Sequence, residues 1–299
     1  MTSKSNVNLL YHLVAFVTIV IWGSTFVFTK LLLLAGLSAA QIFTLRFIIA
    51  YVLLLAYSIR NFRAFADSWR DELLLMALGV TGGSVYFLAE NEALNYTTAT
   101  NTSLIVCSCP LVASVLIGLF YKAERMSRLQ TLGALMAVAG VCVVVLNGHF
   151  VLHLSPIGDT LALAANLCWA LYSVLMIPAG RKYDSVFITR KVFFYGLLTI
   201  IPYYIWRPEE LDFSKITFTS SVLFNLLFLG CVASMACFLA WTWVIKRLGA
   251  MVTTNYVYLN PVATIVFAWW ILSEQITPFF LLGTVLILLG MYLADKKKA

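Results

Sequence analysis

The sequence predicts an all-α integral membrane protein with ten transmembrane helices, arranged as two inverted five-helix repeats with both termini cytoplasmic. Three observations predict this fold class: an unusually apolar composition, ten apolar runs of near membrane-spanning length, and an internal repeat. Of the 299 residues, 62% are apolar and 11% are charged, whereas soluble globular chains are roughly 45–50% apolar and about 25% charged. So few charged side chains cannot cover the surface of a soluble domain.

Ten apolar runs account for most of the chain. A helix needs about 20 apolar residues to cross the hydrocarbon core of a bilayer, and runs near that length occur at 10–31, 39–59, 72–94, 99–121, 128–147, 157–177, 188–206, 220–245, 251–272 and 277–294. The remaining residues are too few for a separate catalytic or regulatory domain. The chain also lacks the GxxxxGK[ST] phosphate-binding loop, so we expect no nucleotide-hydrolysing motor within it.

The basic residues alternate between the two sides of the predicted bundle. If the N-terminus is cytoplasmic, the inner segments hold sixteen of the 20 Lys and Arg residues: Lys4, Arg60, Arg63, Arg70, Lys122, Arg125, Arg128, Arg181, Lys182, Arg190, Lys191, Lys246, Arg247, Lys296, Lys297 and Lys298. The outer segments hold Arg207 and Lys215, while Lys30 and Arg46 lie at or inside the membrane. Because cytoplasmic loops retain positive charge, this asymmetry predicts that both termini are inside and that the number of helices is even. The net charge of +7 is then a topology signal, and no nucleic-acid partner is expected.

No pattern in the sequence indicates catalysis or metal binding. The six cysteines lie within apolar runs and form no CxxC or Cys/His spacing, so we interpret them as small packing residues. His149 and His153 lie in one connection without carboxylate or cysteine partners. The sequence therefore predicts neither an enzyme, nor a metal site, nor a cofactor.

The chain contains an internal repeat. Aligning residues 78–110 with 229–261, an offset of 151, gives nine identical positions in thirty-three: Leu78/Leu229, Gly79/Gly230, Phe87/Phe238, Leu88/Leu239, Ala89/Ala240, Ala99/Ala250, Thr102/Thr253, Val106/Val257 and Pro110/Pro261. We therefore divide the chain into 1–150 and 151–299, each with five helices. Because five is odd, equivalent helices cross the membrane in opposite directions. Inverted repeats of this kind are typical of secondary transporters.

Short motifs recur in the same order in both halves. The first half contains Trp22-Gly23-Ser24, Arg46-Phe47, Pro110, Glu124, Gly133 and Gly140, and the second contains Lys246-Arg247-Leu248-Gly249, Asn260-Pro261, Glu274, Gly283 and Gly290. As an ordered set they resemble the ten-helix EamA-type transporters of the drug/metabolite transporter (DMT) superfamily over nearly the whole chain. The resemblance implies a central cavity surrounded by helices 1, 3, 4, 6, 8 and 9, with helices 5 and 10 peripheral. It also implies export of amino acids, related metabolites or toxic small molecules across a bacterial inner membrane.

Polar side chains share one face of the first predicted helix. These residues are Thr18, Trp22, Thr25 and Thr29, at spacings that place them on one side of a helix. The equivalent part of the second half carries Asn166, Trp169, Tyr172 and Ser173. Such a stripe faces either a cavity or a neighbouring helix, because Ser and Thr also form hydrogen bonds between helices.

Glu90, Asn91 and Glu92 in the third apolar run are the sharpest functional signal. A carboxylate within a membrane helix is costly and usually faces the bundle interior or water, whereas Glu92 is closer to the helix end and is expected to extend to the interface. Arg46 in the second run falls at a similar depth. Three roles for Glu90 remain open: a proton-coupling acid, a partner for a substrate amino group, and a structural counter-ion to Arg46.

Pro110 and Pro261 occupy equivalent positions in the two halves. A proline lacks the N–H of a helical hydrogen bond and disturbs the preceding turn, so each half is predicted to contain a hinge there. Membrane helices also tolerate proline for shape alone, which is the alternative interpretation.

Together these features predict a secondary transporter that exports a small metabolite by alternating access. The alternatives are an importer or lipid-linked substrate flippase of the same fold and, from another class, a membrane-embedded enzyme or receptor. The expected cavity wall comprises Thr18, Trp22, Thr25, Glu90, Asn91, Ser103, Asn166, Trp169, Tyr172, Trp241 and Tyr258. We expect a small-molecule substrate and the lipid bilayer as partners, and a monomer or weak homodimer.

Overall fold

The fold is that of a computed structural model, which describes residues 2–96, 102, 105–121, 127–146, 155–272 and 278–295. Throughout these described residues the regular structure is helical, and no strand occurs in them. The expected site residue Ser103 lies outside the described residues.

The first half of the chain contains α1 (Thr2–Leu34), α2 (Ala39–Ser58), η1 (Ile59–Asn61), α3 (Trp69–Gly79), η2 (Val80–Ser84), α4 (Val85–Tyr96), α6 (Cys109–Phe120) and α7 (Arg128–Leu146). The second half contains α8 (Pro156–Lys182), α9 (Ser185–Thr199), α10 (Ile201–Trp206), η4 (Pro208–Leu211), η5 (Phe213–Lys215), α11 (Ser220–Leu227), η6 (Phe228–Ala236), α12 (Cys237–Leu248), α13 (Ala250–Asn255), η7 (Tyr256–Leu259), α14 (Asn260–Leu272) and α15 (Pro278–Asp295).

Six helical segments of the described chain are long and apolar enough to cross a membrane. They are Leu9–Leu34, Ala39–Asn61, Trp69–Ala93, Pro156–Lys182, Ser185–Trp206 and Ser220–Leu248. Three shorter apolar helices, Cys109–Phe120, Arg128–Val143 and Leu281–Ala294, accompany them. The chain is therefore a multi-pass membrane protein.

Side-chain caps fix where several helices begin. Ser38 and Gln41 form a reciprocal capping box at the start of α2, and Asp184 and Thr219 accept hydrogen bonds from first-turn N–H groups of α9 and α11. These oxygens satisfy backbone donors that have no partner within the helix. At the other end of α12, Gly249 terminates the helix with φ +88°, a conformation that residues with a Cβ rarely adopt.

Two helices widen at equivalent positions of the repeat. The α3–α4 segment contains a π-helical turn at Val80–Ser84, and the α11–α12 segment contains one at Phe228–Ala236. With the offset of 151 between the halves, 80–84 falls on 231–235. π-helical turns displace backbone carbonyls from the regular ladder and are often found at functional sites.

Both predicted proline positions follow a break in the helix. A turn at Cys107 and Ser108 precedes α6, whose first turn contains Pro110. The 3₁₀ turn Tyr256–Leu259 precedes α14, whose first turn contains Pro261. The expected disturbance before each proline is present, while motion at these points stays a prediction.

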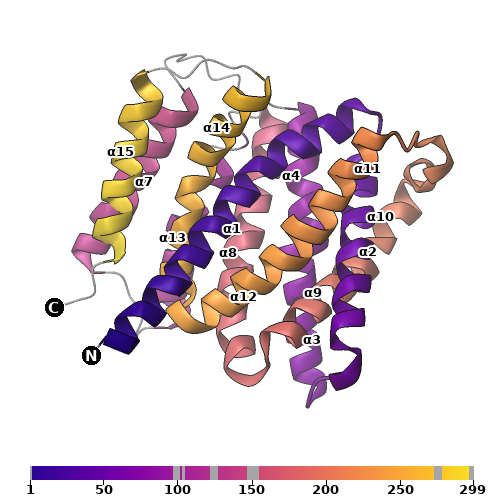
Figure 1. Cartoon of the computed structure of the whole chain (residues 1–299), viewed down its shortest axis with the longest axis horizontal. Coiled ribbons are helices and arrows are strands. Elements are labelled where there is room, and N and C mark those ends of the chain that lie inside the picture. The colour runs from indigo at the N-terminus through magenta and orange to yellow at the C-terminus, as the bar shows by residue number, and fades with distance from the viewer. Residues whose placement is uncertain are drawn as a thin grey trace.

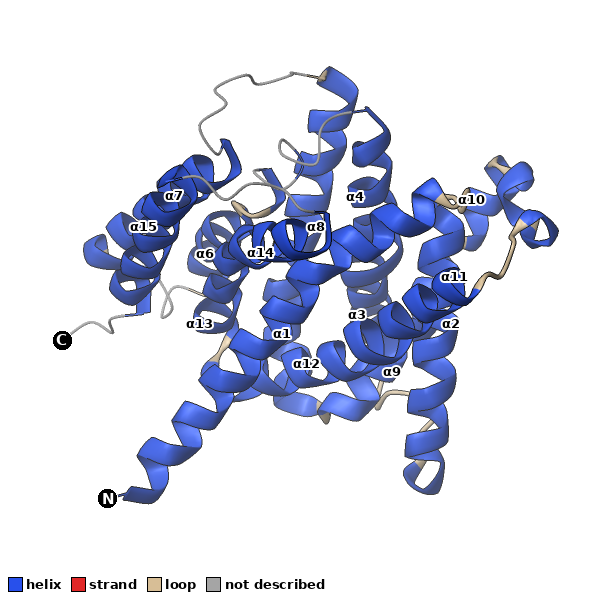
Figure 2. Cartoon of the chain, turned by 45° about the horizontal axis from the view of Figure 1, so that its top comes forward, coloured by secondary structure: helices blue, strands red, loops and turns tan. Residues whose placement is uncertain are grey.

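Helices α7 and α15 pack side by side at one edge of the bundle in both views (Figures 1 and 2). They run in opposite directions, because Gly133 lies against Gly290 while Gly140 lies against Gly283. A Cβ added to Gly133 would stand 2.6 Å from the carbonyl oxygen of Gly290, and one added to Gly290 would stand 2.6 Å from that of Gly133. Glycine is therefore required at this contact because the two backbones approach too closely for a side chain.

Candidate functional site

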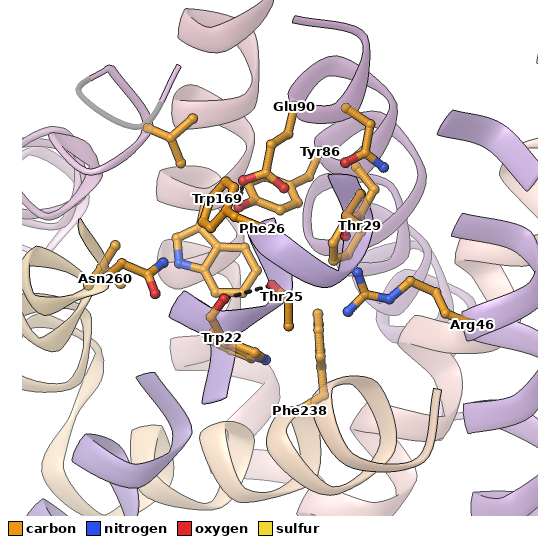
Figure 3. A pocket seen from close by; sticks show the side chains of 14 residues that line it. Trp22, Thr25, Phe26, Thr29, Arg46, Tyr86, Glu90, Trp169, Phe238 and Asn260 are labelled. Atoms are coloured by element: carbon orange, nitrogen blue, oxygen red, sulfur yellow. Dashed lines mark hydrogen bonds between the residues drawn. The ribbon is translucent and has the colours of Figure 1, made fainter. Parts of the chain in front are cut away.

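A cavity between the two halves is lined by buried charged, amide and aromatic side chains. It encloses about 670 Å³ of space unoccupied by atoms, part of it open to solvent. Helices α1, α2, α4, α8, α12 and α14 contribute to its wall, together with Val106 and η7. The lining residues are Trp22, Thr25, Phe26, Thr29, Arg46, Tyr86, Phe87, Glu90, Asn91, Val106, Trp169, Phe238, Val257 and Asn260 (Figure 3).

Aromatic rings form one side of the cavity. The ring of Trp22 lies 5.4 Å from that of Trp169, 5.4 Å from Phe238 and 5.0 Å from Trp241, measured between centroids. Trp169 in turn stacks on Tyr172 at 5.1 Å. Trp241 and Tyr172 are fully buried and lie behind the lining residues. Four of the five sequence-predicted aromatic residues thus meet in one cluster, of which Trp22 and Trp169 reach the cavity.

The π-helical turn η6 holds two of the lining side chains in place. The indole Nε1 of Trp22 donates to the carbonyl oxygen of Ala233 at 2.8 Å, and Nε of Arg46 donates to Oγ of Ser234 at 2.8 Å. Widening of the helix makes a carbonyl available to a side chain from α1. The second half of the chain therefore orients Trp22 and Arg46, which both belong to the first half.

Glu90 and Arg46 bring opposite charges to the same cavity. Their exposed fractions are 6% and 3%. The hydroxyl of Tyr86 donates to Oε1 of Glu90 at 2.9 Å, while the guanidinium carbon of Arg46 lies 4.5 Å from the centroid of the Phe87 ring. Among the described residues, neither Glu90 nor Arg46 forms an ion pair. Figure 3 shows the two side chains on different sides of the cavity. Each charge thus has a neutral hydrogen-bond partner, while the two charges attract each other across the cavity without a direct ion pair.

Two side-chain amides at the cavity lack hydrogen-bond partners among the described residues. These atoms are Nδ2 of Asn91, a donor, and Oδ1 of Asn260, an acceptor. Asn91 is 4% exposed and Asn260 is 8% exposed. Leaving a buried polar atom without a hydrogen-bond partner costs roughly 1–3 kcal/mol. A ligand that forms hydrogen bonds with both amides would therefore bind more tightly.

Besides Tyr172 and Trp241, three predicted cavity residues with described positions do not line the cavity: Thr18, Asn166 and Tyr258. Thr18 donates its hydroxyl to the carbonyl of Val14 at 2.8 Å, and neither Thr18 nor Tyr258 is among the lining residues. Asn166 also lies away from the lining, and its Nδ2 donates to the carbonyl of Ile105 at 2.5 Å and to Oγ of Ser108 at 2.7 Å. Asn166 thereby fastens α8 to the turn that precedes Pro110. Ser103, also predicted to line the cavity, is outside the described residues.

Several lining residues were not singled out by the sequence reasoning. Phe87 and Phe238, as well as Val106 and Val257, are identical pairs of the internal repeat, and all four line the cavity. Identity between the halves was thus the signal that could have found them. Asn260 had the weaker signal of standing next to the repeated Pro261.

The three residues of the Trp22-Gly23-Ser24 motif each make a different kind of contact. Trp22 reaches the aromatic cluster, while Gly23 lies where α1 touches α14, since a Cβ there would stand 2.4 Å from Cβ of Ala263. The hydroxyl of Thr264 also donates to the carbonyl of Gly23 at 2.9 Å. The hydroxyl of Ser24 donates within its own helix.

Residues 9–146 and 156–294 each match the EamA-like transporter family. The chain belongs to the EamA-like transporter family. Two consecutive matches of this family, and relatives named as transporters, confirm the membership expected from the motifs and make the chain a transporter rather than an enzyme.

Full-length relatives agree with this membership. The chain is 29% identical to an uncharacterized transporter of Archaeoglobus fulgidus over 96% of this chain and 98% of that protein. It is 25% identical to a probable amino-acid metabolite efflux pump of Escherichia coli, covering 93% and 92% of the two chains. It is also 25% identical to a probable terminal-alkyne amino-acid exporter of Streptantibioticus cattleyicolor, covering 94% and 91%. A crystal structure with 20% identity superposes with a TM-score of 0.75 over 95% of this chain and 96% of the other, which shows a shared fold.

Proposed function

We propose that this EamA-family protein is a secondary active transporter that exports an amino acid or a related zwitterionic metabolite across a bacterial inner membrane by alternating access. The observation that carries the proposal is the pair of buried opposite charges, Glu90 and Arg46, which face one cavity without forming an ion pair with each other. Intramembrane charges are expensive and mark substrate or ion pathways. Relatives named as amino-acid exporters favour the same substrate class.

A zwitterion complements this cavity. Its ammonium group would bind the Glu90 carboxylate and its carboxylate would bind the Arg46 guanidinium, because charge-assisted hydrogen bonds are the strong ones. The donor Nδ2 of Asn91 and the acceptor Oδ1 of Asn260 supply one further hydrogen bond of each kind. The rings of Trp22 and Trp169 offer apolar and cation–π surface to the rest of the substrate.

The proposed architecture is ten membrane crossings in two inverted halves, 1–150 and 151–299, with both termini cytoplasmic. The contact between α7 and α15 supports the inversion. Gly133 corresponds to Gly283 in the repeat but packs against Gly290, and Gly140 packs against Gly283. Equivalent helices that lie antiparallel are what an inverted repeat requires. We propose a monomer or weak homodimer as the transporting unit.

Export from intact cells tests the proposed direction. Cells with and without the protein are loaded with labelled amino acids and small cationic toxins, and loss of label is followed over time. We expect faster loss of at least one amino acid and resistance to its excess. Faster accumulation would instead establish an importer, and no effect on any solute would reject export and favour the lipid-linked flippase.

Counterflow in proteoliposomes tests the proposed chemistry. Removing either charge from the exported amino acid, by N-acetylation or by decarboxylation, should weaken competition about tenfold or more, since a hydrogen bond to a charged group contributes roughly 1.5–3 kcal/mol. Glu90→Gln should cause a similar loss. Glu92→Gln is the matched control, because Glu92 lies on the same helix but binds Asn95 and Tyr203 outside the cavity. Equal competition by these singly charged analogues would contradict the zwitterion proposal.

A further inference from the structure

The corner between α2 and α3 carries exposed apolar side chains on a fixed backbone. Ile59 is 68% exposed, Phe62 52%, Phe65 75% and Trp69 70%. The corner joins two segments that are each long and apolar enough to cross a membrane, Ala39–Asn61 and Trp69–Ala93. It therefore lies at a membrane surface, where aromatic side chains are favoured.

Contacts to α9 and to the α8–α9 connection hold this corner in one conformation. Arg190 donates to Oγ of Ser58 at 2.9 Å and to the carbonyl of Arg63. The N–H of Asp67 donates to the hydroxyl of Tyr183 at 3.0 Å, and within the corner itself the N–H of Ala66 donates to Oε2 of Glu72 on α3 at 2.7 Å. A surface whose backbone is already ordered loses little conformational entropy when a ligand binds.

A groove runs from this corner along α3. It encloses about 680 Å³, including space open to solvent, and is lined by Phe65, Ala66, Ser68, Trp69, Glu72, Leu73, Met76 and Tyr195. Met76 lies seven residues beyond Trp69, about 10 Å along the helix. The groove thus extends from the membrane surface towards the apolar interior, and most of its lining is apolar.

The charges at the corner leave two arginines without acidic partners. Asp67 pairs with Arg63, Asp71 pairs with Lys182, and Glu72 pairs with Lys191. All three acids of the segment 59–76 are therefore already neutralised. Arg60 and Arg70 are exposed and enter none of the ion pairs given for the described residues.

We propose that this surface binds an anionic phospholipid, with an acyl chain in the groove and the phosphate against Arg60 and Arg70. The basic pair selects the negative headgroup, and Phe65, Trp69 and Met76 contact the chain. Each arginine near an anionic membrane surface contributes on the order of a fivefold gain in affinity. The site is separate from the transport cavity, so it does not depend on the identity of the transported substrate.

Quenching of Trp69 fluorescence tests the proposal. The full chain is placed in phosphatidylcholine nanodiscs that contain an equal mole fraction of chain-brominated phosphatidylglycerol or chain-brominated phosphatidylcholine. The contribution of Trp69 is the difference between the wild type and Trp69→Phe. We expect several-fold stronger quenching of Trp69 by brominated phosphatidylglycerol, and loss of that preference in an Arg60→Gln/Arg70→Gln variant.

Arg128→Gln is the control, because it removes an exposed arginine at the start of α7, outside the groove, and it should keep the preference. Equal quenching by the two lipids, or an undiminished preference in the double arginine variant, would overturn the proposal. If Trp69→Phe does not fold, native mass spectrometry of the wild type and the double arginine variant replaces it. The wild type should then retain more phosphatidylglycerol than phosphatidylcholine, and equal retention of the two lipids would count against the site.

Discussion

Glu90 and Arg46 face the same cavity but are held by different neutral groups, Tyr86 and Ser234. If they were structural counter-ions, neutralising both would cost less than the two separate substitutions. Residues that do not share partners usually contribute additively, within about 0.3–0.5 kcal/mol. We therefore predict that the thermal shift of Glu90→Gln/Arg46→Met lies close to the sum of the two single shifts, with only a small difference from the attraction of the two charges across the cavity, measured by thermal unfolding in detergent. If the double variant is clearly more stable than the sum of the two single shifts predicts, Glu90 is a structural counter-ion to Arg46.

Trp22 combines an aromatic contact with one directional hydrogen bond to Ala233. Trp22→Phe keeps a ring but leaves the Ala233 carbonyl without the indole donor, which should destabilise the fold by roughly 1–3 kcal/mol. Trp269→Phe is the matched control, since Trp269 is 51% exposed on α14. A comparable loss of thermal stability in both variants would show that the hydrogen bond from Trp22 to the Ala233 carbonyl does not stabilise the fold.

At the residue scale, the sequence predicts cavity residues best where a polar or charged side chain would be costly to expose to lipid. Polarity and helical spacing predict five cavity residues that the structure also places there: Trp22, Thr25, Glu90, Asn91 and Trp169. Apolar lining residues such as Phe87 and Val257 could not be recognised by composition, because lipid-facing and core positions are equally apolar in a membrane helix. Thr18 shares the predicted face of α1 but does not line the cavity.

The α7–α15 pair shows how an element depends on close backbone approach. A Cβ on Gly140 would stand 2.7 Å from the N atom of Ile287 and 2.8 Å from the carbonyl oxygen of Gly283. Gly140→Val should therefore force the helices apart and destabilise the protein by about 1–3 kcal/mol, the usual cost of overpacking. The control is Leu135→Val on the same helix, where Leu135 is 52% exposed. The two thermal midpoints in detergent check the prediction, and equal midpoints would contradict it.

Pro110 stands at a break that α8 contacts directly, because Asn166 donates to the carbonyl of Ile105. Pro110 does not line the cavity, so Pro110→Ala permits a more continuous helix without removing a cavity contact. If the break is a hinge, Pro110→Ala should slow counterflow several-fold while substrate affinity stays within about twofold. Pro178→Ala is the control, because Pro178 lies inside α8 and away from the cavity. Unchanged transport in Pro110→Ala would assign the proline to helix shape alone.

At the element scale, apolar length located the helices but not the widening of their turns. The run 72–94 contains Gly82 and Gly83, which are weak helix formers, and the structure widens the helix there, at Val80–Ser84. That widening depends on tertiary contacts such as the approach of Gly82 to the ring of Tyr172, which come from the other half of the chain. The breaks before Pro110 and Pro261 were predictable because proline acts on its own helix.

For the whole molecule, the number of crossings and the side on which each loop lies can be tested together. Helix α6 has 12 residues, about 18 Å, whereas the hydrocarbon core is about 30 Å thick. If α6 and the short α7 each belong to a complete crossing, Asn61 and Arg128 lie on the same side of the membrane. If only the six long segments cross, one crossing separates Asn61 from Arg128. Thr217 lies opposite Asn61 in either arrangement, so Arg128 is the position that shows whether α6 completes a crossing.

We predict that a membrane-impermeant maleimide added to intact cells labels Thr217→Cys but neither Asn61→Cys nor Arg128→Cys, and that all three react after the membrane is opened. The three side chains are exposed, and none of them takes part in the hydrogen bonds that shape the cavity. The unsubstituted protein supplies the background from its six native cysteines, which lie within helices or their turns. The expected pattern follows from positive charge retained on the cytoplasmic side, with Arg128 and Arg60 inside and Arg207 outside. Labelling of Arg128→Cys from outside would show that α6 does not complete a crossing and that the two halves are not equivalent. Labelling of Asn61→Cys from outside would show that the topology is inverted, with both termini outside.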